Sequence, residues 1–326
     1  MELLRDADID HAALAGKRVA IIGFGNQGRP QALNLKDSGI DVVVGLRPGS
    51  SSAIVAAELG LEIANLPEAT QSADVVMLLA PDEMLSAIYH ELEPALRNGA
   101  ALGFSHGLAI RFELIRPRPD LDVFMVAPKG PGTALRSLYE AGKGMVALWA
   151  VAQDATGSAR QVALAYGRAI GCGRAGLIAS TFAEECDADL FNENAVVWGG
   201  VPELLIAGFD TLVEAGISPE IAYLECVGEL SLIAELIEAR GIAGMREAIS
   251  NTAELGATLG GPQIIDGSVR TRMREILADI RSGKFAGRLS AEAAGGYPVL
   301  SQARSQSREL DVERAYKKLK PLKPDA

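Results

Sequence analysis

Six short apolar runs alternate with helical or loop segments between residues 18 and 151, and no other feature restricts the fold as strongly. The runs are RVAIIG (18–23), IDVVVGL (40–46), ADVVMLLA (73–80), AALGFS (100–105), DVFMVAP (122–128) and GMVALWAV (144–151). Continuously apolar runs of this kind are typical of strands in a parallel sheet that helices cover on both faces. The sequence therefore predicts an α/β fold with a doubly wound N-terminal domain.

The character of the chain changes after a Gly- and Cys-rich stretch at residues 169–180. Residues 181–282 carry long apolar runs with the 3.6-residue period of helices. A chain of 326 residues also exceeds the size at which one core usually keeps growing. We therefore expect two domains, an N-terminal domain over 1–180 and an all-helical domain over 181–326.

Helix boundaries within the second half have their own signals. Ser218 followed by Pro219 is typical of a helix start, with the serine as cap and the proline in the first turn. Gly216 and Gly241 are in positions typical of helix ends.

Charge and cysteine content exclude several classes of function. The formal net charge of −11 disfavours nucleic acid and anionic membrane surfaces as partners. Three cysteines without CxxC spacing give neither a disulfide framework nor a zinc site, and they fit a reducing compartment. The first residues are charged, and no window holds 18 successive apolar residues, so we expect no signal peptide, no spanning helix and a cytoplasmic location.

A glycine motif follows the first predicted strand directly. Gly23, Gly25 and Gly28 form G-x-G-x-x-G where a helix should begin, with Pro30 in its first turn. In that context, backbone amides at the helix N-terminus face the pyrophosphate of a dinucleotide. The motif predicts a Rossmann-type domain that binds a nicotinamide dinucleotide.

The end of the second predicted strand indicates which dinucleotide. An NAD site would carry an acidic residue there for the ribose 2′-hydroxyl, but the sequence is VVVGLRPGSSS. Arg47, Ser50, Ser51 and Ser52 instead offer a guanidinium group and hydroxyls that suit a 2′-phosphate. This pattern favours NADPH over NADH, whereas a merely polar turn would leave the cofactor undecided.

Two pairs of acidic residues lie four apart on apolar predicted helices. They are Asp189 with Glu193 and Glu225 with Glu229. Like charges at this spacing share a helix face and repel by roughly 0.2–0.5 kcal/mol, unless a cation lies between them. If the helices meet, within one chain or across a dimer, the four carboxylates surround one cavity. Oxygen ligands without His or Cys suit Mg²⁺ or Mn²⁺.

The acidic residues beside the first pair have a simpler interpretation. Glu184, Glu185 and Asp187 are interpreted as a solvated helix face.

At this point the sequence resembles the ketol-acid reductoisomerases, in their shorter form with a single helical C-terminal domain. The segments that carry the resemblance are IIGFGNQG, GLRPGSSS, FSHG, APKGPG, EECDADLFNEN, YLECVGEL and ISNTAELG, and the likeness extends from residue 6 to about residue 320. The resemblance implies conversion of 2-acetolactate, or 2-aceto-2-hydroxybutyrate, into a 2,3-dihydroxy-3-methyl acid in branched-chain amino-acid biosynthesis. It further implies NADPH, two Mg²⁺ ions and a homodimer with intertwined helical domains, or a higher homo-oligomer.

The resemblance also implies roles for individual residues. His106, Lys129 and Glu229 match catalytic positions, and Ser250 matches a substrate contact. The metal ligands would be Asp189, Glu193, Glu225 and Glu229. Besides the motif glycines, cofactor contacts would be Phe24, Asn26, Gln27, Arg47, Ser50, Ser52, Asp82, Glu83, Met84, Leu85 and Gly132. Without the resemblance, His106 would be interpreted as a loop histidine and Lys129 as a surface charge.

Several positions depart from the family's pattern. Thr133 replaces a usual histidine, as does Gly228, and Ser231 replaces a usual lysine. Because Gly228 and Ser231 flank Glu229, these changes motivate an alternative, a relative that acts as a reductase or isomerase on a different 2-oxo acid. A further alternative is a non-catalytic NADPH-binding protein built on the same scaffold.

Overall fold

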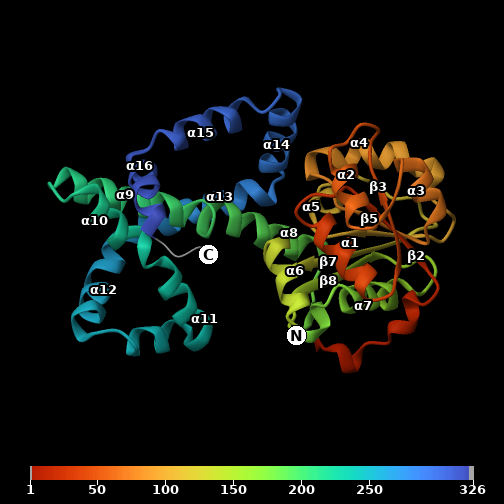
Figure 1. Ribbon diagram of the computed structural model, residues 1–326, viewed down its shortest axis with the longest axis horizontal. Coiled ribbons are helices and arrows are strands. Elements are labelled where there is room, and N and C mark those ends of the chain that lie inside the picture. Colours follow the sequence, from red (N-terminus) through yellow and green to blue (C-terminus); the bar gives the residue numbers. More distant parts are fainter. Residues whose placement is uncertain (1, 323–326) are drawn as a thin grey trace. The chain divides into compact units, whose positions relative to one another are not determined.

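The computed structural model describes residues 2–322, which form two compact units that divide between Ala188 and Asp189 (Figure 1). The units divide within helix α8 (Phe182–Phe191), whereas the sequence places the change near Ser180. The difference arises because the start of α8 packs on the first unit, where Phe182 joins a buried cluster and Glu185 accepts hydrogen bonds from Gly107 and Lys129. The Gly- and Cys-rich stretch supplies a further strand, β9 (Leu177–Ala179), to this unit.

The first unit contains a nine-stranded sheet in the order β1-β9-β8-β7-β6-β5-β2-β3-β4. All six predicted runs form strands. The bounds are β1 (Leu3–Leu4), β2 (Arg18–Ile22), β3 (Asp41–Gly45), β4 (Glu62–Ala64), β5 (Val75–Leu78), β6 (Ala101–Phe104), β7 (Asp122–Pro128) and β8 (Ala147–Gln153). Two pairings depart from the predicted parallel arrangement, since β7 and β8 are antiparallel, as are β1 and β9.

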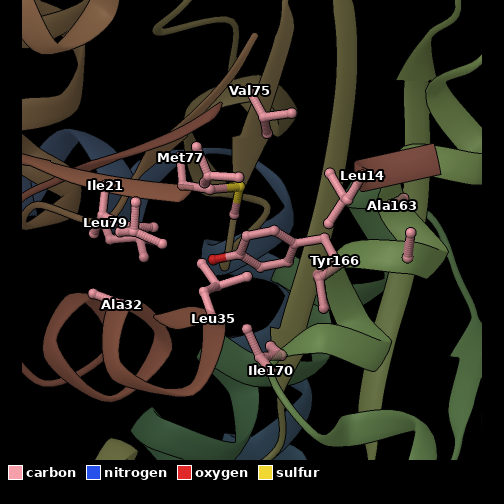
Figure 2. Close-up of a cluster of buried hydrophobic side chains, with 14 of the residues drawn as sticks. Leu14, Ile21, Ala32, Leu35, Val75, Met77, Leu79, Ala163, Tyr166 and Ile170 are labelled. Atoms are coloured by element: carbon pink, nitrogen blue, oxygen red, sulfur yellow. The ribbon is translucent and has the colours of Figure 1, made fainter. Parts of the chain in front are cut away.

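Helices cover both faces of this sheet, which confirms the doubly wound fold. They are α1 (Gly28–Asp37), α2 (Ser52–Glu58), α3 (Leu66–Ser72), α4 (Asp82–Leu92), α5 (Leu108–Arg111), α6 (Gly132–Glu140) and α7 (Ala159–Ala169). Side chains of β2 alternate between two buried clusters, with Ile21 in one and Ile22 in the other. The first cluster includes Leu35 of α1 and Tyr166 of α7 (Figure 2).

The register of the parallel strands brings their carboxyl ends to one edge. Ile22 pairs with Leu78, and Leu78 pairs with Phe104. The segments that follow these residues therefore begin side by side, where ligands bind in open α/β sheets.

The second unit is helical, as predicted. Its helices are α9 (Gly200–Glu214), α10 (Pro219–Tyr223), α11 (Leu230–Glu247), α12 (Asn251–Ile264), α13 (Gly267–Arg281), α14 (Lys284–Ala294), α15 (Pro298–Arg308) and α16 (Asp311–Leu319). A small core joins α9, α10 and α16 around Phe209, Tyr223 and Ala315. Helix α16 is therefore packed up to Leu319.

The predicted helix signals hold with two qualifications. Gly216 has a φ of 90° just after α9, and Gly241 has a φ of 68° at a break inside α11 rather than at its end. Ser218 occupies the N-cap of α10, but its side chain makes no capping hydrogen bond.

Much of the apolar surface of the second unit is uncovered in one chain. Helix α12 has no buried residue, and Leu255 and Leu259 on it are 62% and 61% exposed. The helical segment Phe182–Glu214 has the length and mean hydropathy, 1.4, of a membrane-crossing helix. The prediction of no such segment counted only uninterrupted apolar residues, and Asp189 and Glu193 interrupt this one. Length and composition alone are weak evidence for a span, since an apolar helix of a soluble protein meets the same criteria.

Candidate active site

The glycine turn has the geometry that a dinucleotide site requires. Gly23 has a φ of 98°, which disfavours any residue with a side chain. A Cβ atom on Gly28 would collide with the Gly23 carbonyl oxygen, so the start of α1 packs directly on the strand end. Gly25 has open space beside it and lines the cavities on either side of Pro81. The turn therefore leaves room for the pyrophosphate at the helix N-terminus.

One of these cavities, of about 470 Å³, lies over the end of β3. Arg47, Ser50 and Ser52 line it, together with Met84 and Ile88 of α4. Arg47 is the one charged residue among its described lining residues. The cavity is therefore suited to an anionic group.

The other cavity, of about 320 Å³, lies over the ends of β2, β5 and β6. The residues lining it that bear on its chemistry are Asn26, Gln27, Asp82, Leu85, Ser105 and His106. Its position beside the glycine turn is that of the nicotinamide end in a Rossmann-type domain.

His106 is held in this second cavity by acidic neighbours. Its Nδ1 lies 3.2 Å from Asp82 Oδ2, and its Nε2 lies 4.0 Å from Glu185 Oε2. Burial by itself lowers the histidine pKa, but hydrogen bonds to Asp82 and Cys186 and the nearby carboxylates outweigh burial and raise it well above 6.5. These neighbours therefore favour the protonated form of the partly buried His106.

Glu185 corrects the sequence interpretation, because it is not on a solvated face. Its side chain is 1% exposed, and it accepts hydrogen bonds from the Gly107 backbone N–H at 2.8 Å and from Lys129 Nζ at 2.6 Å. Asp187 is also largely covered and pairs with Arg111 at 3.4 Å. The missed signal was spacing, since Glu185, Asp189 and Glu193 recur every four residues and share one helix face.

The other predicted cofactor residues differ in their surroundings. Gly132 begins α6, and a Cβ atom there would collide with the Asn26 carbonyl group, so this glycine supports the glycine turn. Asp82 contacts His106, while Glu83 lines neither of the two cavities. Phe24 is buried beside the β3 cavity.

The acidic pairs lie in unusual turns. Glu193 belongs to a π-helical turn, Asn192–Val196, and Glu225 to another, Leu224–Gly228, which Glu229 follows directly. Such wide turns inside helices are frequent at functional sites. Glu193, Glu225 and Glu229 are exposed, and within the described part of one chain the four acids do not gather into one metal-binding group. One chain therefore does not bring the two pairs together.

Ser250 is the N-cap of α12, where its Oγ accepts a hydrogen bond from Ala253 N at 3.2 Å. Its hydroxyl proton remains available for a second hydrogen bond.

Comparison with known proteins agrees with this geometry. Residues 13–176 match the family domain described as acetohydroxy acid isomeroreductase, NADPH-binding domain, and residues 182–324 match ketol-acid reductoisomerase, C-terminal domain. The solved structure of an NADH-preferring ketol-acid reductoisomerase from an uncultured archean is 44% identical, with 100% of both chains covered and a TM-score of 0.96.

Two more distant structures share the fold alone. A semialdehyde dehydrogenase NAD-binding protein from Cupriavidus necator, in complex with calcium and NAD, is 21% identical over 82% of this chain and 99% of that one, with a TM-score of 0.60. Pyrroline carboxylate reductase from Plasmodium falciparum, with NADP bound, is 12% identical over 83% and 98%, with a TM-score of 0.52.

Proposed function

The chain belongs to the ketol-acid reductoisomerase family, whose members are NAD(P)-dependent oxidoreductases, and from this premise we propose its specific reaction. It converts 2-acetolactate, or 2-aceto-2-hydroxybutyrate, into the 2,3-dihydroxy-3-methyl acid, with NADPH and Mg²⁺, in cytoplasmic branched-chain amino-acid biosynthesis. The observation that carries this proposal is the match of both family domains to this chain, together with a cavity at the cofactor edge that His106 lines.

The reaction needs two steps. The 2-hydroxyl group loses its proton, the alkyl group moves with its bonding electrons from C2 to C3, and the 3-oxo oxygen gains a proton, which gives a 3-hydroxy-2-oxo acid. Hydride from NADPH then adds to C2, and a proton adds to the oxygen on C2. The chemistry that a bound pair of Mg²⁺ ions supplies is polarisation of the oxo group and a lower pKa of the hydroxyl group.

The residues of this chain fit these needs. Asp189, Glu193, Glu225 and Glu229 offer only oxygen ligands, which Mg²⁺ prefers. Glu229 would also exchange a proton with the substrate hydroxyl group. His106 can hold a proton near the reacting oxygens, because Asp82 fixes one of its nitrogens. Ser250 would contact the substrate through its remaining hydroxyl proton.

The separation of the acidic pairs within one chain supports a site shared by two chains. The uncovered apolar helices of the second unit need a partner surface, and a second copy of this chain would provide one. In this homodimer, Asp189 and Glu193 of one chain would meet Glu225 and Glu229 of the other.

NADPH rather than NADH is favoured by Arg47, because the cavity at the end of β3 contains one cationic residue and no acidic residue among its described lining. The alternative has support from the solved relative, which prefers NADH. Initial rates with each cofactor decide between them. We expect kcat/KM to be at least about tenfold higher with NADPH, the value of one charge-assisted hydrogen bond. A preference for NADH would contradict this assignment.

A substrate panel tests the reaction itself. The purified protein is incubated with Mg²⁺, NADPH and either 2-acetolactate or a simple 2-oxo acid, and the product is identified by mass spectrometry. We expect the dihydroxy acid from 2-acetolactate. Turnover of only the 2-oxo acid would instead favour the specialised relative that Gly228 and Ser231 suggest. Failure of the protein to bind Mg²⁺ in calorimetry would favour a non-catalytic protein.

A further inference from the structure

The core of the first unit contains a buried glutamine that reaches the edge of the nicotinamide cavity. Gln31 on α1 is 0% exposed. Its carboxamide contacts three side chains: Gln27 and Ser105 at 3.0 Å each and Tyr166 at 2.6 Å. Gln27 and Ser105 line the cavity, whereas Tyr166 belongs to the core beneath it. Figure 2 shows the Tyr166 hydroxyl group directed toward the side of α1 that carries Leu35.

The direction of every hydrogen bond in this group follows from one backbone carbonyl. Gln27 Nε2 donates to the Gly130 carbonyl oxygen at 3.2 Å, and a carbonyl oxygen can only accept. Gln27 therefore presents its Oε1 to Gln31, which must offer its amide nitrogen there. The Oε1 of Gln31 consequently faces Tyr166, and the tyrosine must donate.

The orientation of the Gln31 carboxamide also determines the role of Ser105. Gln31 Nε2 donates to Ser105 Oγ, so the serine accepts on that side and its own proton is directed elsewhere. Ser105 lines the cavity next to His106. Its hydroxyl proton is thus available for donation to a group bound in this cavity.

Tyr166 is well suited to hold this arrangement. It is fully buried and packs edge-to-face on Phe124, with ring centroids 6.0 Å apart. Burial is the main cause that raises its pKa well above 10, so the hydroxyl keeps its proton. Reversal of the Gln31 carboxamide would place its Oε1 against the Oε1 of Gln27, two acceptors facing each other without a proton between them.

We propose that Tyr166 and Gln31 are positioning residues that orient Gln27 and make Ser105 a hydrogen-bond donor to the nicotinamide end of the bound dinucleotide. The inference rests on the proposed function only in requiring that a nicotinamide dinucleotide binds over β2, β5 and β6. Gln31 and Tyr166 do not touch the cofactor; they act through two residues that do.

Cofactor affinity tests the proposal, with Tyr166→Phe and Ser105→Ala as the variants. NADPH binding to the full-length protein is titrated by nucleotide fluorescence, without acid substrate. We expect each variant to weaken binding about 2- to 10-fold, the range for one neutral hydrogen bond. The double variant should bind as weakly as Ser105→Ala alone, because both changes remove the same interaction.

Tyr89→Phe is the matched control. Tyr89 is also buried and its hydroxyl accepts from Arg118 N at 3.0 Å, but it belongs to the buried cluster on the other face of the sheet. The control should lose stability in urea without any change in NADPH affinity.

Three results would overturn the proposal: unchanged affinity in Ser105→Ala, additive losses in the double variant, or equal losses in Tyr166→Phe and Tyr89→Phe. If Tyr166→Phe fails to fold, the NADPH affinity of Ser105→Ala still tests the proposal. Failure of the proposed function is distinct, because it would leave NADPH binding intact in a protein that does not convert 2-acetolactate.

Discussion

The buried carboxylate of Glu185 has its shortest ion pair with Lys129, at 2.6 Å, whereas His106 lies 4.0 Å away. Lys129 is 30% exposed and Glu185 is 1% exposed, so removing the lysine leaves an ion in the interior, whereas removing the charge of the glutamate leaves a solvated lysine. We expect Lys129→Met to lower the free energy of unfolding by roughly 3 kcal/mol in urea without divalent cations, and Glu185→Gln by less. The double variant should be more stable than Lys129→Met. A smaller loss in Lys129→Met than in Glu185→Gln would contradict this account.

The raised pKa of His106 gives stability a defined dependence on pH. A histidine whose folded pKa lies above its unfolded value contributes stability that is fully present below about 6.5 and is lost as pH rises through the folded pKa. We therefore expect the stability advantage of wild type over His106→Asn, in metal-free buffer, to shrink as pH rises above 6.5. Urea midpoints measured for both proteins from pH 6 to pH 9 give this difference in stability. An advantage that grows with pH would show that the histidine is neutral in the folded protein.

Residue types and resemblance each predicted some of the candidate site residues. His106 and Lys129 were found through resemblance, since neither residue alone has a pattern that distinguishes it from a surface group. Glu185 was missed because its charge indicates exposure. Its spacing to Asp189 indicates a shared helix face, but the fold is needed to show that Lys129 and Gly107 surround it. Burial of a charge depends on partners far away in sequence, which local composition does not contain.

At the scale of elements, the carboxyl ends and the amino ends of the strands have different roles. The candidate site residues of the first unit follow the carboxyl ends of strands, while Asp122 at the start of β7 holds the loop before α7. It accepts from Thr156 N at 2.9 Å, from Thr156 Oγ1 at 2.6 Å and from Ser158 Oγ at 3.3 Å.

We expect Asp122→Ala to lower the free energy of unfolding by about 2–3 kcal/mol, because it leaves several donors without their acceptor. Asp122→Asn should cost less, since one oxygen remains. NADPH affinity should be unchanged in both, as fluorescence titration can check. Weaker NADPH binding by folded Asp122→Asn would contradict the separate roles of the two ends of the strands.

The element-scale predictions succeeded where the apolar runs were long. Residues 122–128 form β7 with the predicted bounds, whereas β4 and β9 have three residues each and were not predicted. The π-helical turns at Glu193 and Glu225 were not predicted either. A single wide turn adds only one residue, so it leaves the 3.6-residue period of the apolar residues almost unchanged.

At the scale of the molecule, the apolar helices of the second unit predict association. Leu255, Leu259 and Ile264 on α12 are 60–62% exposed. Because an apolar face of this kind needs a covering surface, we expect the protein to be a dimer in sedimentation experiments. Leu259→Glu should weaken the dimer at least about tenfold and reduce turnover, while NADPH affinity stays unchanged. A monomeric wild type with full activity would contradict the shared site.

The sequence could not specify whether the acidic pairs meet within a chain or between chains. Both arrangements satisfy the same four-residue spacing, and only the positions of the helices distinguish them. The fold class and the helical character of the second half were predictable, since both depend on periodicity along the chain.

Glu193→Gln tests most directly whether the acidic residues perform the alkyl shift apart from the cofactor site. Formation of the dihydroxy acid from 2-acetolactate and the Kd for NADPH are measured on the same preparation. We predict that product formation is abolished, because a metal ligand is lost, while the Kd stays within about twofold of wild type. Retained product formation, or an equal loss of NADPH affinity, would contradict the assignment of the two functions to separate sites.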